Sequence, residues 1–110
     1  MVVSKEEEIP TMTNTMFLNS IHAELDRLTA LLKNAEKHED MLDDLAREKW
    51  VKVENMEAAP AESYTQAECD RIYDEYDLAD KAHRKAEDEI DEIEDAIAKL
   101  KELKEIYEEN

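Results

Sequence analysis

The sequence contains no glycine, and this absence limits the number of turns that the chain can make. Glycine is the residue that most often ends helices and fits tight turns, so few turns are expected. A glycine-rich loop that binds phosphate is excluded for the same reason. Only two prolines are present, and Pro60 lies in the segment EAAPAES, residues 57–63. Because proline disfavours helical geometry in the residue before it, this segment is the clearest break in the chain.

Cysteine and long apolar runs are also scarce. Cys69 is the only cysteine, so the chain cannot form an internal disulfide, a pattern that fits a reducing compartment. No apolar run approaches the ~20 residues that a membrane-spanning helix needs. No basic segment followed by an apolar segment marks a signal peptide at the N-terminus. We therefore expect a soluble, cytoplasmic protein that does not contact a membrane.

Basic residues are few relative to acidic ones. The chain has 14 Lys and Arg against 31 Asp and Glu, which gives a formal net charge of −17. Such a field repels nucleic acids and anionic membranes, and it attracts basic partners. Direct binding to nucleic acid is therefore not expected.

Two stretches show the spacing of helices that pack along one seam. Charged residues make up 41 % of the chain and aromatic residues 5 %, which is typical of long, solvent-exposed helices. Apolar residues recur at alternating steps of three and four, as a helix seam requires. The first seam is Leu18, Ile21, Leu25, Leu28, Leu32 and Ala35, continuing less regularly through Glu39, Leu42, Ala46, Lys49 and Val53. The second seam is Cys69, Ile72, Tyr76, Ala79, His83, Ala86, Ile90, Ile93, Ile97, Leu100, Lys104 and Tyr107.

These seams predict an all-α fold, a long antiparallel helical hairpin that resembles a coiled coil. The expected parts are a flexible N-terminal arm over residues 1–12, a helix over about 13–57, a turn over about 58–63 and a helix over about 64–108. Two capping boxes are candidates for the start of the second helix: Ser63 with Gln66, and Thr65 with Glu68. A short connection requires the two helices to run antiparallel.

A second apolar edge lies outside the first seam. We expect further protein surface to bury this edge, because two helices alone shield little apolar surface from water. Its members are Phe17, Leu31, Met41, Leu45 and Trp50. A homodimer that forms a four-helix bundle would cover this edge. The alternative is that the edge binds a different protein, with Trp50 as an interface anchor in place of a core residue.

Histidine and carboxylate residues meet near the middle of the predicted hairpin. His38 and Glu39 on the first helix should lie near His83, with Asp80 and Glu87 one helical turn on either side of His83. Such a cluster can be a polar layer that fixes helix register, as in coiled coils, and we favour this interpretation. The alternative is a divalent metal bound by residues drawn from His38, Asp80, His83 and Glu87. We predict no metal and no other cofactor.

Catalysis has little support in the sequence. Cys69 falls on the second seam, where a thiol packs as a small apolar group. The pairs Glu36/Glu39 and Glu92/Asp95 have the spacing with which helical nucleotide hydrolases bind magnesium. The hairpin register, however, separates these pairs by about 10 Å. We therefore predict that the protein is not an enzyme.

The segment AEDEIDEIED, residues 86–95, holds seven acidic residues and no basic one. A solvated helix face usually mixes lysine with glutamate, because oppositely charged pairs three or four residues apart stabilise a helix. An acidic segment of this kind can instead dock on a basic partner. Rows of carboxylates on a helix can also occupy a groove built for phosphates, as a nucleic-acid mimic does.

We therefore expect a non-catalytic acidic protein that binds and occludes a basic, nucleic-acid-binding surface of another protein. The partner would be a nucleic-acid-binding enzyme, and phage proteins that oppose host defence are one setting for such inhibitors. The predicted binding surface is Asp74, Glu75, Asp77, Glu87, Asp88, Asp91, Glu92, Glu94 and Asp95. The alternative is a coiled-coil assembly or adaptor protein that acts through the apolar edge of the first helix.

Overall fold

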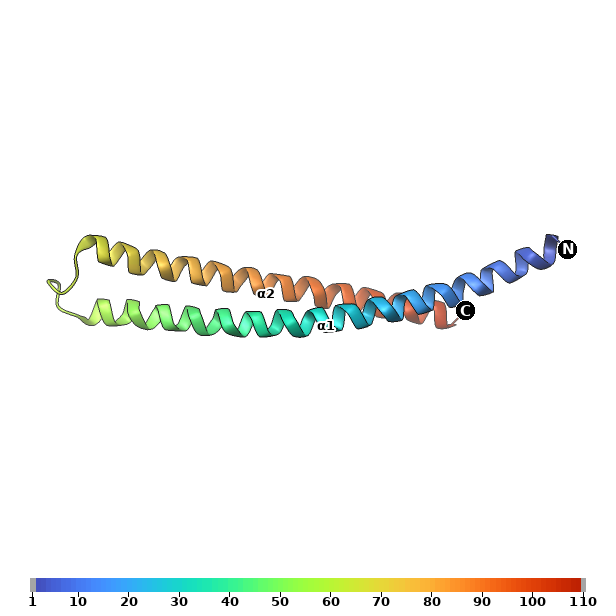
Figure 1. The fold of residues 1–110 in the computed structure, drawn as a ribbon, viewed down its shortest axis with the longest axis horizontal. Helices are drawn as coiled ribbons and strands as arrows, with labels where there is room; N and C mark the ends of the chain where they lie inside the picture. Colours follow the sequence, from blue (N-terminus) through green and yellow to red (C-terminus); the bar gives the residue numbers. More distant parts are fainter. Residues whose placement is uncertain (1, 110) are drawn as a thin grey trace. The chain divides into compact units, whose positions relative to one another are not determined.

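The computed structural model describes the backbone of residues 2–109 and the side chains of residues 14–108. It contains two long helices, α1 over Val2–Ala58 and α2 over Gln66–Glu109, and no strand within the described residues (Figure 1). The prediction of an all-α fold with two long helices is therefore confirmed. Helix α1 includes residues 2–12, and the flexibility expected of that arm stays a prediction. Within the described residues, neither helix has a segment long and apolar enough to cross a membrane.

The chain divides into two compact units, and each is described by itself. The turn-proximal unit comprises residues 34–91, in which α1 and α2 lie side by side and are joined by the turn (Figure 1). The terminal unit comprises the residues up to Lys33 and those from Glu92 onward. In the terminal unit the rings of Phe17 and Tyr107 stack with their centroids 5.4 Å apart.

The turn is built from proline and from local hydrogen bonds. The amide of Ser63 donates to the carbonyl of Pro60 at 2.9 Å. One predicted capping box forms at the start of α2: the Glu68 amide donates to Oγ1 of Thr65 at 3.1 Å, and the Thr65 amide donates to Oε1 of Glu68 at 3.4 Å. The other box is wrong, because Gln66 donates its side-chain amide to Asp70 at 2.9 Å. Helix α2 thus begins two residues after the predicted start, with Thr65 as its N-cap.

The cores follow the predicted seams, except that Met56, which was not predicted, continues the first seam beyond Val53. Every seam residue of α2 is buried or half-buried, from Cys69 to Tyr107. The buried apolar side chains of the turn-proximal unit are Ala46, Val53, Met56, Ala79 and Ala86, and those of the terminal unit are Ile21 and Leu28. Three of the five in the turn-proximal unit are alanines, which let helices approach closely but bury little apolar area. Hydrophobic burial within this unit is therefore small.

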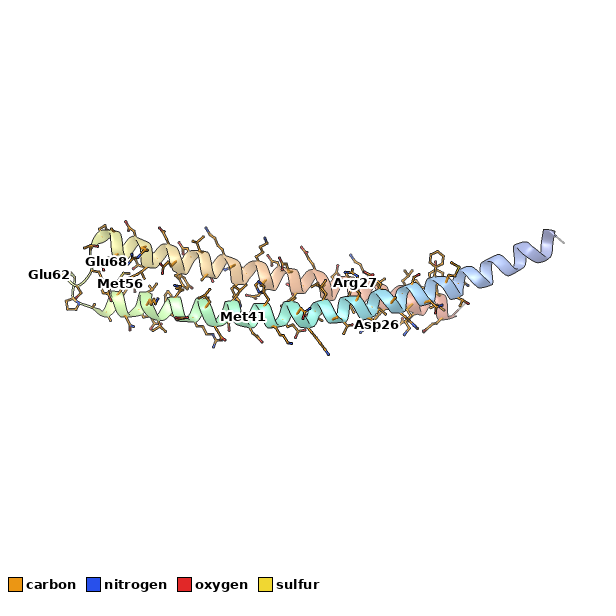
Figure 2. The ribbon with its side chains drawn as sticks, in the orientation of Figure 1. Asp26, Arg27, Met41, Met56, Glu62 and Glu68 are labelled. Atoms are coloured by element: carbon orange, nitrogen blue, oxygen red, sulfur yellow. The ribbon has the colours of Figure 1, made fainter. Side chains whose placement is uncertain are left out.

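Many large apolar side chains remain exposed. Figure 2 shows side chains that project from both helices. Met41 on α1 and Leu78 on α2 are the most exposed, at 69 % and 68 %. All five predicted edge residues are in this exposed group: Phe17, Leu31, Met41, Leu45 and Trp50. The predicted dimer that would cover them stays a prediction.

Candidate functional site

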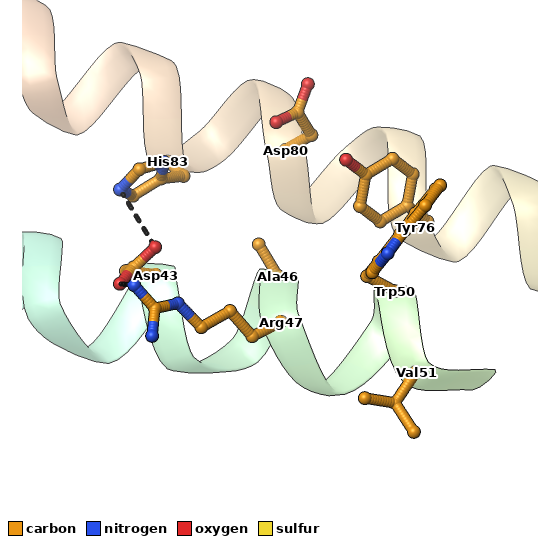
Figure 3. A pocket seen from close by; sticks show the side chains of 8 residues that line it. All are labelled: Asp43, Ala46, Arg47, Trp50, Val51, Tyr76, Asp80 and His83. Carbon is orange, nitrogen blue, oxygen red and sulfur yellow. Dashed lines mark ion pairs between the residues drawn. The ribbon is translucent and has the colours of Figure 1, made fainter. Parts of the chain in front are cut away.

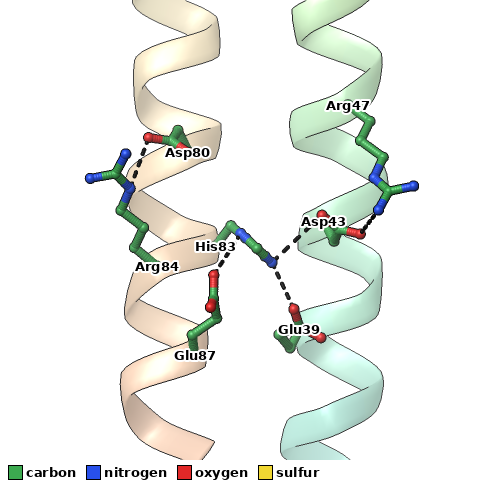
Figure 4. Close-up of polar contacts among 7 residues, drawn as sticks. All are labelled: Glu39, Asp43, Arg47, Asp80, His83, Arg84 and Glu87. Carbon is green, nitrogen blue, oxygen red and sulfur yellow. Dashed lines mark hydrogen bonds and ion pairs between the residues drawn. The ribbon is translucent and has the colours of Figure 1, made fainter.

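His83 in the turn-proximal unit lies among three carboxylates that come from both helices (Figure 4). Nε2 of His83 is 2.7 Å from Oε1 of Glu39 and 3.7 Å from Oδ1 of Asp43, both on α1. Nδ1 of His83 is 3.1 Å from Oε1 of Glu87, one helical turn further along α2. The His83 side chain is 17 % exposed and that of Glu39 is 22 % exposed. The cluster therefore links the two helices at a partly buried position.

The carboxylates favour the charged form of the imidazole. The hydrogen bond to Glu39 is the main cause that raises the pKa of His83 above its ordinary value. Partial burial lowers this pKa, while the charges of Glu87, Glu39 and Asp43 raise it further. With both ring nitrogens protonated, His83 donates to Glu39 across the helices and to Glu87 along α2. This is the interhelical polar contact expected of a layer that fixes register.

The metal candidates predicted from the sequence are only partly brought together. His83 and Glu87 do lie in the cluster, where Glu39, His83 and Glu87 have nitrogen and oxygen atoms within 4.8 Å of one another. Asp80 instead pairs with Arg84, at 3.1 Å. His38 is exposed and makes none of the cluster contacts that the structure gives. Glu39 takes its place because it lies on the seam of α1.

A shallow groove runs from this cluster toward the turn (Figure 3). It has a volume of about 360 Å³ and begins at His83 and Asp43. Its far end is formed by Trp50 and Tyr76, whose ring centroids are 5.1 Å apart. Trp50 thus contacts α2 through its ring and still exposes 44 % of its surface. Both roles that the sequence allows for Trp50, packing and anchoring, fit this position.

The predicted acidic surface separates into two groups of side chains. Three members are already paired within their own unit: Glu75 with Lys49 at 3.2 Å, Glu87 with His83 at 3.1 Å, and Asp95 with Lys99 at 3.0 Å. The other six are exposed and make no ion pair with the described side chains: Asp74, Asp77, Asp88, Asp91, Glu92 and Glu94.

Besides the contact of Asp43 with His83, two interhelical hydrogen bonds in the turn-proximal unit were not predicted. Lys49 donates to Glu75, and this hydrogen bond is the main cause that lowers the pKa of Glu75. The hydroxyl of Tyr73 donates to Oε1 of Glu57 at 3.0 Å. The seam position of Lys49 was the available signal for the first contact, because a cation on a seam needs an anion from the opposite helix.

A second apolar groove lies on α1, with a volume of about 390 Å³. Met41, Leu42 and Leu45 supply its apolar side chains, and the polar residues His38, Asp44 and Glu48 line it as well. Two of the predicted edge residues, Met41 and Leu45, therefore share one surface of the turn-proximal unit.

Comparison with protein-family models, with curated proteins and with solved structures found no match to this chain.

Proposed function

We propose that the protein acts by binding, as a non-catalytic acidic protein that occludes a basic, nucleic-acid-binding surface of another protein. The observation that supports this proposal is the set of exposed carboxylates on α2 that have no ion-pair partner among the described side chains. In the turn-proximal unit these are Asp74, Asp77, Asp88 and Asp91, and in the terminal unit they are Glu92 and Glu94.

The repulsion between these unpaired carboxylates destabilises α2, which is a reason to assign them a role. Like charges three or four residues apart destabilise a helix by about 0.2–0.5 kcal/mol a pair. Asp74 with Asp77 and Asp88 with Asp91 are such pairs. Elsewhere on α2, acidic residues form ion pairs with basic ones, as in Asp80 with Arg84 and Asp95 with Lys99. A basic partner would provide the missing counter-charge.

Carboxylates at these spacings suit a site that binds phosphates. Residues three apart on a helix are separated by about 4.5 Å along its axis. Phosphates of one DNA strand advance about 3.4 Å per nucleotide along the duplex axis and also wind around it. A basic groove with flexible Lys and Arg side chains can accept both arrays. A nuclease or another nucleic-acid-binding enzyme is the partner class that this proposal specifies, as in phage inhibitors of host defence.

The test is a charge reversal with a matched control. Asp88, Asp91, Glu92 and Asp95 are changed to Lys in one variant. The control changes Asp26, Glu36, Asp40 and Glu54 to Lys, all exposed on α1, and so has the same net charge. Each protein is immobilised and exposed to a bacterial extract depleted of nucleic acid.

The proposal expects the wild-type and control proteins to retain basic nucleic-acid-binding proteins that added duplex DNA displaces. It expects the α2 variant to lose them, and retention to weaken steeply as salt rises because screening acts on exposed charges. Equal retention by both variants, or retention that DNA does not affect, would contradict the mechanism. Circular dichroism checks that both variants remain helical.

A second candidate is a coiled-coil assembly or adaptor protein that dimerises into a four-helix bundle. The observation that favours it is the exposed apolar edge of α1, above all Met41 and Leu45 around their groove. Light scattering on a sizing column measures the solution mass. Replacing Leu31, Leu45 and Trp50 with polar residues would then dissociate the assembly, whereas the α2 charge reversal would not.

A further inference from the structure

We propose that the His83 cluster binds one divalent transition-metal ion of the zinc class. The ligands are Nε2 of His83 and the carboxylates of Glu39 and Asp43, and Glu87 orients the ring. The ion would join α1 to α2 within the turn-proximal unit. This inference is independent of the acidic surface proposed above.

The two ring nitrogens of His83 have different partners, and this difference defines the ligand set. A single ion binds through one ring nitrogen. Nε2 lies beside oxygens of Glu39 and Asp43, whereas Nδ1 lies beside Glu87 (Figure 4). A histidine that binds a metal almost always donates its other ring N–H to a carboxylate or carbonyl. Glu87, with Oε1 3.1 Å from Nδ1, is placed to accept that hydrogen bond.

The distances around Nε2 are close to those that a metal requires. Two ligands at about 2.0–2.2 Å from a tetrahedral zinc ion lie about 3.4 Å apart. Nε2 is 2.7 Å from Glu39 and 3.7 Å from Asp43, on either side of that value. In the proposed three-ligand site the Nε2–Glu39 distance opens and the Nε2–Asp43 distance closes toward that value. Water would complete the coordination.

Asp43 also forms an ion pair with Arg47 on its own helix. Nη2 of Arg47 lies 3.1 Å from Oδ2 of Asp43, while Oδ1 is the oxygen that faces His83. An ion pair to one oxygen fixes the orientation of the other, which is the usual role of groups around metal ligands. Asp43 can therefore bind the ion through Oδ1 without losing Arg47.

The cluster holds more negative than positive groups, since Glu39, Asp43 and Glu87 surround one imidazole and Arg47 pairs with Asp43. A divalent ion would offset part of this negative charge. Nε2 binds the ion as neutral imidazole, and any proton on it is released to solvent. An imidazole ligand selects zinc, nickel or copper, whereas magnesium and calcium prefer oxygen alone. The His83 ring thus distinguishes this site from the exposed carboxylates, which attract any cation.

The first test is zinc titration calorimetry on protein without a histidine tag, with millimolar magnesium present to occupy the exposed carboxylates. We expect one zinc ion per chain. His83→Gln should abolish this binding, and Glu87→Gln should weaken it by about 10–100-fold, as for other partners of metal-bound histidines. His38→Gln is the matched control, because it removes an exposed histidine of the same unit and should leave the affinity unchanged.

Glu39→Gln provides a variant of nearly equal shape in case His83→Gln does not fold, and it should also lose affinity. Failure of the wild-type protein to bind zinc would overturn the proposal. Equal binding by the wild type and His83→Gln would overturn it as well, since the ion would then be held by surface carboxylates.

Nitrogen-15 chemical shifts of the imidazole test the ligand assignment. Zinc should shift Nε2 of His83 and leave Nδ1 protonated against Glu87. A shift at Nδ1 in place of Nε2 would overturn the assignment of Glu39 and Asp43 as ligands.

Discussion

Two valines on α1, two residues apart, should respond very differently to the same substitution. Val53 is 0 % exposed and is the only large side chain that is fully buried among the described residues. Val51 is 53 % exposed, and Figure 3 shows it pointing away from α2. Val53→Ala and Val51→Ala therefore remove the same atoms from the same helix, and only burial differs.

The magnitude follows from this difference. Removing two buried carbons costs about 0.8 kcal/mol each, and the residual cavity adds about 24 cal/mol per Å³. Alanine favours a helix over valine by about 0.5 kcal/mol, but this gain is common to both variants and cancels in the comparison. We expect Val53→Ala to be less stable than Val51→Ala by roughly 2–3 kcal/mol, a large part of the 5–15 kcal/mol typical of a domain.

Urea denaturation followed by circular dichroism at 222 nm measures both variants, at two protein concentrations. A shift of the midpoint without a change of slope indicates a pure change in stability. Equal losses in the two variants at both concentrations would refute the assignment of Val53 to the core and Val51 to the surface. A loss in Val51→Ala that grows with protein concentration would place Val51 in an interface between copies of the chain.

Two further predictions concern the turn and one tyrosine. Thr65→Ala should lower the free energy of unfolding by about 1 kcal/mol because it removes the N-cap of α2, whereas Ser63→Ala, outside that helix, should change it little in the same urea assay. The hydrogen bond to Glu57 is the main cause that raises the pKa of Tyr73, so Glu57→Gln should lower that pKa in a titration of tyrosinate absorbance near 295 nm. Because the folded pKa is the higher one, the Tyr73 contribution to stability is present below the unfolded pKa and is lost as pH rises through the folded pKa. An unchanged late-titrating tyrosine in Glu57→Gln would contradict this contact.

The seams were predictable because a helix leaves little choice about which residues face its neighbour. Steps of three and four identified Ala79, His83 and Ala86 as inward positions, and all three are buried or half-buried. The helix termini were less predictable, because two overlapping capping boxes compete. Only hydrogen-bond geometry shows that Thr65 caps the helix in place of Ser63.

The partners across the helices were harder to predict for a physical reason. Carboxylates are frequent along both helices, so the choice of partner depends on register to within a single residue. That register is set by the conformation of the turn, which no spacing rule fixes. The sequence therefore placed His83 near Glu39 but also admitted His38 and Asp80, and it did not identify Asp43 as a neighbour of His83.

The thin core of the turn-proximal unit gives its interhelical polar contacts unusual weight. Ala46, Ala79 and Ala86 contribute little hydrophobic free energy, since an alanine buries only a methyl group. Contacts that join the helices, above all His83 with Glu39, then make up a larger share of what holds the pair in register. Exposed like charges such as Asp88 and Asp91 act in the opposite direction, and salt screens them. Raising salt should therefore weaken the repulsion between like charges and stabilise the free protein, while it lowers the affinity for a basic partner. Opposite effects of salt on stability and on affinity distinguish the charge-led proposal from the apolar one. In the apolar proposal, salt has the same small effect on stability and on affinity.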